Sequence, residues 1–290
     1  MENSTSALRL GQVIAALDEF FPPESAQSWD RVGLTAGDPA QPVAKVLLAV
    51  DPSLAVIDQA IAGGYDLIVT HHPLLLRGIN SVATTSAKGV AVTRLISAKV
   101  ALYCAHTNAD VADPGVGQAL AHAAGLTTTH PLEITEGQEL GRVGELSASM
   151  SLADFAGLLS RNLPQTAAGL RVSGPPDAVV QRVAVLGGAG DSAFGAVRAS
   201  GADIYVTADL RHHAALEARE EALVGDGTPY LIDAGHFATE YLWLQGLADR
   251  LIAHNFDAAQ SLEAHVSTIV TDPWTFVVGG STPTPSKDSA

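Results

Sequence analysis

The chain has little cysteine, few aromatic residues and no excess of positive charge. Its single cysteine, Cys104, excludes an internal disulfide and a metal cluster held by thiolates. Cys104 ends the apolar run that begins at Val100, which is typical of a small buried side chain. Lysine and arginine number 16 against 31 acidic residues, without a basic cluster, so nucleic acid is not an expected partner.

Long apolar runs are also missing, and no segment approaches the length that spans a membrane. The N-terminus lacks a basic stretch followed by an apolar one, so we expect no signal peptide and a cytoplasmic location. The hydrophobic content is 47% with only 5% aromatic, which predicts an aliphatic core of helices packed on parallel strands. A chain of 290 residues can form one large or two ordinary domains.

The most informative stretch runs from Asp66 to Pro73 and reads DLIVTHHP. Its apolar run predicts a buried parallel strand, and His71 and His72 follow at the carboxyl end, where open α/β sheets bind ligands. Neighbouring side chains on an extended chain point in opposite directions, so each imidazole is expected to serve one of two adjacent ions. The alternative interpretation is a pair of surface loop histidines.

Apolar periodicity and turn residues predict a chain of alternating strands and helices. Strands are expected at residues 45–50, 66–70, 100–104, 142–150, 179–186, 203–207, 229–233, 266–270 and 275–278. Helices are expected at residues 10–21, 53–62, 86–98, 113–125, 192–200, 211–224 and 237–252, and one opens at Ser151. Asp113-Pro114 is expected to cap its helix, residues 127–141 to cross between domains, and residues 281–290 to be disordered.

The two halves of the chain repeat one pattern. The sequence GYDLIVT at residues 64–70 returns as GADIYVT at 201–207, 137 positions later, and the preceding strands match at the same offset. The next strand in each half leads to a histidine and, four residues later, a carboxylate: His106 and Asp110, then His236 and Glu240. We therefore predict an α/β fold of two pseudo-repeated lobes with mainly parallel sheets and a metal site in the cleft between them. The first lobe is assigned residues 1–127 plus 234–280, and the second residues 128–233.

The strand ends together supply a nitrogen and oxygen donor set. Its members are His71, His72, His106, Asp110, His236 and Glu240. Such donors without sulfur suit Zn, Fe, Mn, Co or Ni, and a bridging carboxylate could hold two ions. Taken singly, His236 with Glu240 also fits a surface pair, and residues 106–110 also fit a turn.

Two further stretches carry weaker signals. Residues 187–192, GGAGDS, follow a strand and precede a helix, so they could hold an anion, although a plain tight turn is the favoured interpretation. Asp209 and His213 follow the strand that corresponds to the one before His71, and they are candidate proton-transfer residues lining the cleft. A solvated helix start would explain them equally well.

Five motifs resemble those of the Nif-three-like family, whose members are named GTP cyclohydrolase I type 2 homologues or dinuclear-metal proteins. They are WDRVGL at residues 29–34, THHP at 70–73, HTNAD at 106–110, TAD at 207–209 and GHFATE at 235–240. The resemblance spans about residues 8 to 278. Two positions depart from the family pattern: Arg31 stands where Asn is usual, and Ala208 replaces a Gly.

The resemblance implies a specific ligand set for two divalent ions. His72 and Asp110 would bind one ion, His71 and His236 the other, and Glu240 would bridge them. His106 would lie close to the metals. The resemblance also implies two similar lobes and a toroidal homohexamer with the metals facing an internal cavity.

We therefore expect a metal-dependent hydrolase of a nucleotide-like or other phosphorylated small molecule. Metal-bound water would attack, and His106 or His213 would move protons. The alternative is a non-catalytic metal-binding or regulatory scaffold that forms a ring.

Overall fold

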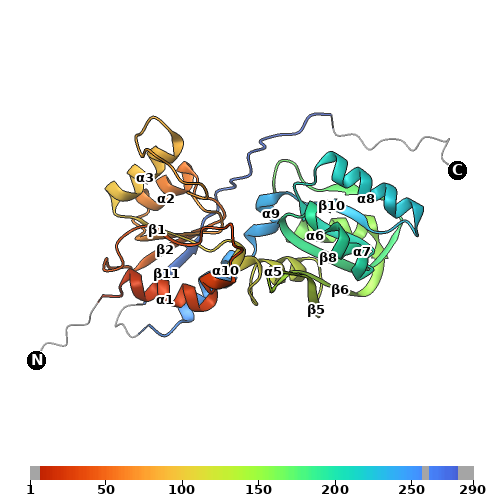
Figure 1. The fold of residues 1–290 in the computed structure, drawn as a ribbon, viewed down its shortest axis with the longest axis horizontal. Helices are drawn as coiled ribbons and strands as arrows, with labels where there is room; N and C mark the ends of the chain where they lie inside the picture. The colour runs from red at the N-terminus through yellow and green to blue at the C-terminus, as the bar shows by residue number, and fades with distance from the viewer. Residues whose placement is uncertain (1–6, 257–260, 280–290) are drawn as a thin grey trace, which may run out of the picture.

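The computed structural model describes residues 7–256 and 261–279, and these form two α/β lobes that lie side by side (Figure 1). The predicted fold class is confirmed: each lobe has its own sheet with helices on both faces. Within the described ranges, no helix combines the length and the apolar character needed to cross a membrane. The predicted disordered tail, residues 281–290, lies outside the described residues.

The sheet of the first lobe has the strand order β1–β4–β3–β2–β11. Its strands are β1 (Gly33–Ala36), β2 (Lys45–Ala49), β3 (Leu67–Thr70), β4 (Ala101–Cys104) and β11 (Glu263–Val266). All neighbours are parallel except β1 and β4. Parallel strands need crossover connections, and the helices α2 (Leu54–Ala62) and α3 (Ala87–Ala98) supply them.

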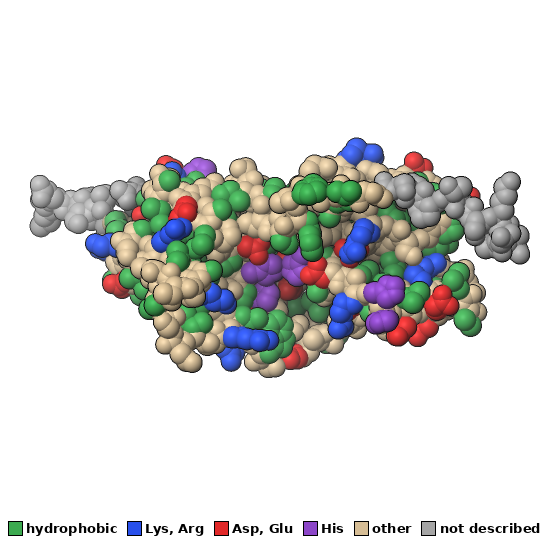
Figure 2. Space-filling view, turned by 90° about the horizontal axis from the view of Figure 1, so that it is seen from above, with side chains coloured by type: hydrophobic (Ala, Val, Ile, Leu, Met, Phe, Trp, Pro, Cys, Tyr) green, Lys and Arg blue, Asp and Glu red, His purple; other side chains and the backbone are tan. Residues whose placement is uncertain are grey.

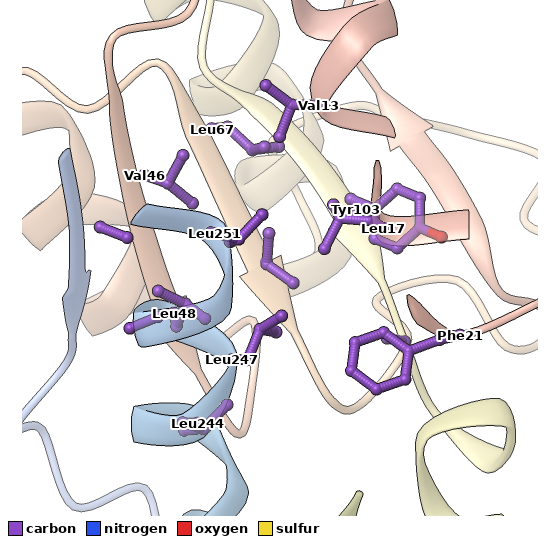
Figure 3. Close-up of a cluster of buried hydrophobic side chains, with 14 of the residues drawn as sticks. Val13, Leu17, Phe21, Val46, Leu48, Leu67, Tyr103, Leu244, Leu247 and Leu251 are labelled. Atoms are coloured by element: carbon purple, nitrogen blue, oxygen red, sulfur yellow. The ribbon is translucent and has the colours of Figure 1, made fainter. Parts of the chain in front are cut away.

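Both faces of this sheet are buried, which explains why its strands read as continuous apolar runs. Alternate residues point to opposite faces, so Val46 and Leu48 enter one core while Leu47 enters the other. Leucines of α10 (Trp243–Ala253) pack on the first face together with α1 (Leu10–Phe20), as Figure 3 shows. Helices α2 and α3 cover the second face.

The sheet of the second lobe has the order β5–β6–β8–β9–β10–β7. Its strands are β5 (Thr129–Thr135), β6 (Gln138–Ser151), β7 (Arg171–Ser173), β8 (Val179–Ala189), β9 (Ile204–Ala208) and β10 (Tyr230–Asp233). Its helices are α5 (Val116–Ala123), α6 (Leu152–Asn162), α7 (Phe194–Ser200) and α8 (His212–Val224). Strands β8, β9 and β10 are parallel, and the remaining pairings are antiparallel. The expectation of mainly parallel strands thus holds for the first sheet and the centre of the second.

The sequence repeat is also a repeat of hydrogen bonds. The carboxylate of Asp66 accepts the backbone N–H groups of Ala44 and Lys45 at 2.8 and 3.0 Å. That of Asp203 accepts the N–H groups of residues 181 and 182 at 2.8 and 2.7 Å. Each lobe also adds a short antiparallel strand, β1 or β7, beside the last strand of its repeat. The lobes therefore share one construction, while the boundaries at residues 127 and 233 stay predictions.

Residues 127–141 form no crossing between domains but most of a β-hairpin. Strands β5 and β6 pair antiparallel, from Thr129 opposite Gly144 to Thr135 opposite Gln138. At the turn, Glu136 and Gly137 have φ values of 49° and 82°, the left-handed conformation that closes two-residue hairpins. The prediction failed because threonine and proline in this stretch suggested a loop, whereas β5 is an edge strand, where such residues are tolerated.

Three other expected elements differ in their bounds. Helix α5 begins at Val116 with Gly115 as N-cap, so Asp113-Pro114 does not open it. The expected strand at 266–270 lies earlier, as β11, and residues 275–278 form no strand in the described chain. The helix expected at 237–252 is divided into α9 (His236–Tyr241) and α10.

Helices α5 and α9 connect the two cores. Phe237 of α9 packs in the core of the first lobe, and its neighbour Ala238 packs in the core of the second. Val116 and Leu120 of α5 divide between the same two cores. Side chains on α9 are therefore held at the junction of the lobes.

Candidate metal centre

Histidines gather where three parallel strands end. His71 and His72 follow β3, His106 follows β4, and His236 opens α9 three residues after the end of β10. Parallel strands bring their carboxyl ends to one edge of a sheet, and here the edges of the two sheets meet. Figure 2 shows the histidines in a hollow between the lobes, with acidic side chains beside them.

Glu240, on α9, lies at the centre of this group and is 3% exposed. Its Oε1 atom is 3.4 Å from Nε2 of His71 and 3.1 Å from Nε2 of His236. Its Oε2 atom is 3.0 Å from Nε2 of His72. Nε2 of His72 and His236 are 3.2 Å apart, and Asp110 Oδ1 is 3.6 Å from Nε2 of His71. Five side chains from both lobes thus converge.

The Nδ1 atom of each imidazole makes a hydrogen bond that orients the ring. The partners are the carbonyl oxygen of Ala105 for His71 (3.0 Å), Asp51 for His72 (2.7 Å), Asp30 for His106 (2.9 Å) and Asp209 for His236 (2.7 Å). A carbonyl oxygen can only accept, so Nδ1 of His71 carries a proton, and Nε2 faces the centre. Metal-binding histidines are commonly oriented by carboxylate or carbonyl partners of this kind.

The centre contains buried acceptors without donors. Nε2 of His71 and Oδ1 of Asp110 are buried and make no hydrogen bond. Buried polar atoms are otherwise nearly always paired, and lone pairs that face one another repel unless a cation lies among them. The 3.2 Å between the Nε2 atoms of His72 and His236 also suits two nitrogens about 2.0–2.1 Å from one ion. The donors therefore fit a divalent metal.

The electrostatics lead to the same conclusion. Burial lowers the pKa of His72, but its contacts with Asp51 and Glu240 outweigh this and raise the pKa to about 10. For His236, burial is likewise outweighed by Glu240, and the pKa rises to about 9. Burial also raises the pKa of Asp110. The pKa values of the imidazoles rise because the carboxylates around them attract positive charge, which a bound cation would supply.

The structure places the predicted ligands together. Asp110 lies beside His71, and His72 lies beside His236, whereas the resemblance groups His72 with Asp110. In both arrangements Glu240 is the shared carboxylate. The roles of individual ligands stay predictions.

The three candidate catalytic residues lie in different surroundings. His106 contacts the cluster, with ring centroids 5.1 Å from His71 and 5.5 Å from His72. Asp209 holds the ring of His236 and lines the hollow. His213 is not brought to the cluster: it is exposed in the first turn of α8, against His212. This differs from the expectation because α8 starts beyond the rim of the hollow.

Sequence reasoning missed Asp51 and Asp30, which orient His72 and His106. Asp51 lies just after β2, at the same sheet edge as the histidines, and this position was an available signal. Asp30 belongs to the WDRVGL motif and also accepts two hydrogen bonds from Thr107. Both carboxylates would have qualified as candidates from their place next to a strand end or in a motif.

Gly188 was also missed, because residues 187–192 were interpreted as a tight turn. Strand β8 continues to Ala189, and Gly188 has a left-handed φ of 67°. A Cβ atom there would lie 2.3 Å from Oε1 of Glu240 and 3.3 Å from Nε2 of His236. Gly188 therefore forms a wall of the centre that only glycine fits.

Comparison with known proteins agrees with this geometry. A GTP cyclohydrolase 1 type 2 homolog from Streptomyces coelicolor is 48% identical over 287 residues, which is 97% of this chain and 99% of that one. The solved structure of Staphylococcus aureus hypothetical protein SA1388 matches with a TM-score of 0.84 and 29% identity, over 94% of this chain and 100% of that chain. Reduced HcgD from Methanocaldococcus jannaschii matches with a TM-score of 0.74 and 30% identity, over 92% and 100%. The family model described as Duf34/NIF3 (NGG1p interacting factor 3) matches residues 8–273, and the chain belongs to this family.

Proposed function

We propose that this protein is a cytoplasmic metal-dependent hydrolase that binds two divalent ions and acts on a nucleotide-like or other phosphorylated small molecule. One observation carries the proposal: Glu240 is buried 3.0–3.4 Å from three imidazole nitrogens, two from the first lobe and one from α9. The name of the Streptomyces relative, a GTP cyclohydrolase 1 type 2 homolog, supports a nucleotide-like substrate.

The contacts suggest how the residues would divide between two ions. His72 and His236 would hold one, His71 and Asp110 the other, and Glu240 would be shared. Such a metal pair supplies a nucleophilic hydroxide at neutral pH and neutralises negative charge on a phosphate. Zn, Mn, Fe, Co and Ni all accept this donor set.

The protein itself would orient the ligands and move protons. Asp51 and Asp209 hold His72 and His236 by 2.7 Å hydrogen bonds, which keeps their Nε2 atoms directed at the centre. His106 is held by Asp30, which is buried, while its own side chain is 14% exposed. It can therefore exchange a proton between the centre and a bound molecule.

Glu240→Gln tests the proposal. The amide keeps the shape but removes the shared negative charge, so metal content should fall from two ions per chain and hydrolysis should be lost. Metal analysis of the purified protein and turnover of GTP and generic phosphoesters with Mn²⁺ or Zn²⁺ are the measurements. Glu217→Gln, on the exposed face of α8, is the matched control and should behave like the native protein. Full metal content and activity in Glu240→Gln would contradict the proposal.

The full burial of His71, at 0% exposed, would equally suit an ion that is held rather than used. The second candidate is therefore a non-catalytic metal-binding or regulatory scaffold. Two bound ions that depend on Glu240, without turnover of any nucleotide or phosphoester, would favour it.

A further inference from the structure

A cavity of about 690 Å³ opens beside the metal centre, between the lobes. This volume is within the range of small-molecule sites. The centre forms one end of the cavity through His72 and His236. Two other parts of its wall have a different chemistry: a pair of arginines, and an apolar stretch of the C-terminal segment.

Arg171 and Arg211 are the arginines of this wall, in a chain with only 16 lysines and arginines. Arg171 forms an ion pair with Asp233, whose side chain is 9% exposed, and Arg211 forms one with Asp191, which is 14% exposed. The two arginine side chains are 69% and 80% exposed. Each carboxylate is thus more buried than the guanidinium with which it pairs. A guanidinium has five N–H donors, so donors remain for a second anion.

Both arginines lie close in the fold to residues that position His236. Arg171 of β7 is the cross-strand partner of Asp233, the last residue of β10. Arg211 comes two residues after Asp209, which holds the ring of His236. The backbone position of Arg171 is therefore fixed by strand pairing, and that of Arg211 by its place at the start of α8, just after Asp209.

The apolar stretch contains Trp274 and Phe276, which are 69% and 75% exposed. Aromatic residues make up 5% of the chain, so two exposed ones beside the metal centre are notable. In Figure 1 this segment runs from the first lobe across to the second. Thr271 anchors it by donating a hydrogen bond to Asp51, which orients His72.

We propose that this cavity binds a phosphorylated molecule with a flat aromatic ring. Arg171 and Arg211 bind the phosphate, and Trp274 stacks on the ring. The inference rests on the proposed function for the metal centre and names the recognition elements of its substrate. Asp51, Asp209 and Asp272 also line the cavity and would repel an anion, so binding requires the metal-loaded protein.

The test is calorimetric binding of GMP, guanosine and inorganic phosphate to metal-loaded protein. Native protein should bind GMP at least tenfold more tightly than guanosine. The double variant Arg171→Gln/Arg211→Gln should lose that difference. Trp274→Ala should weaken GMP and guanosine by 5-fold or more but leave inorganic phosphate unchanged, because stacking on an aromatic side chain is worth about 1–3 kcal/mol per base.

Arg198→Gln is the matched control, because Arg198 pairs with Glu221 on the outer helices α7 and α8. It should bind GMP like the native protein. Arg171→Lys/Arg211→Lys, which keeps the charge, should recover part of the affinity. Equal binding of GMP by native protein and the double Gln variant would overturn the phosphate site. A change of oligomeric state in Trp274→Ala, with ligand binding unchanged, would overturn the stacking role.

The outcome separates this inference from the proposed function. If GMP binding depends on the arginines but no phosphoester is turned over, the recognition site is supported and the hydrolase function is contradicted. If the double Gln variant turns over substrate with an unchanged KM, the hydrolase function is supported and the recognition site is contradicted.

Discussion

Gly188 shows how much a single residue contributes to the centre. Its left-handed φ of 67° excludes most residues, and the missing side chain leaves room for the carboxylate of Glu240. Its N–H donates to Thr239, next to Glu240 on α9, and its carbonyl accepts from Thr207 on β9. The backbone at Gly188 is therefore tied to both elements that border the site.

Gly188→Ala should reduce metal affinity at least tenfold, since the new Cβ would lie 2.3 Å from Oε1 of Glu240. Gly201→Ala is the matched control, because Gly201 has nearly the same φ of 68° and a Cβ added there would meet nothing within 4 Å. Both variants should lose about 1–2 kcal/mol of unfolding free energy from left-handed strain. Competition with a chelating dye measures metal affinity, and urea unfolding measures stability. Equal metal affinity in the two variants would contradict the role of Gly188.

At the scale of elements, the repeated unit is a strand, a helix and a strand, and the second strand is entered through a half-buried aspartate that accepts backbone hydrogen bonds. Asp66 and Asp203 each join the start of their own strand to the start of the preceding strand. The apolar runs of these units, and the starts of several helices elsewhere in the chain, were predictable because they depend on neighbours in sequence. Ser53, Ser86 and Ser151 each cap a helix by accepting a backbone N–H.

Asp66→Asn and Asp203→Asn should each lower the unfolding free energy by about 1–3 kcal/mol, because each weakens two hydrogen bonds to a charged acceptor. The two residues lie in different lobes, so their effects should add in the double variant. Asp177→Asn, at an exposed position, is the control. Urea unfolding measures all four variants. A large loss of unfolding free energy in one variant and none in the other would mean that the two aspartates do not contribute equally to stability.

At the scale of the molecule, the candidate metal centre draws its side chains from both lobes. His71, His72 and Asp110 belong to the first sheet and its connections, while His236 and Glu240 follow β10 of the second. Bound ions would therefore resist separation of the lobes as well as screen the buried carboxylates. The homohexamer implied by the family resemblance stays a prediction at this scale.

Removal of metal should lower the melting temperature. A ligand present at a thousandfold excess over its Kd stabilises the native state by about 4 kcal/mol. Calorimetry with and without EDTA should therefore show a fall of several degrees, reversed by added Zn²⁺ or Mn²⁺. Glu240→Gln should melt at the same temperature in both conditions. If the melting temperature of the native protein changed with neither chelator nor metal, a metal centre between the lobes would be contradicted.

Apolar periodicity, strand-end position and side-chain chemistry are local properties, and they were enough to predict the α/β class, the two-lobe repeat and the donor set. The sequence also placed a strand or helix correctly wherever the apolar pattern was long. It misjudged the β5–β6 hairpin, whose stability comes from pairing in the sheet and not from its own composition.

The way in which the donors meet depends on contacts between distant parts of the chain. The distance between His72 and His236 joins residues 164 positions apart, and the bond from Thr271 to Asp51 spans 220. The carboxylates behind the imidazoles, the fit of Gly188 against Glu240 and the arginines of the cavity depend on such separations. Those contacts arise from packing of whole elements, which no local pattern records.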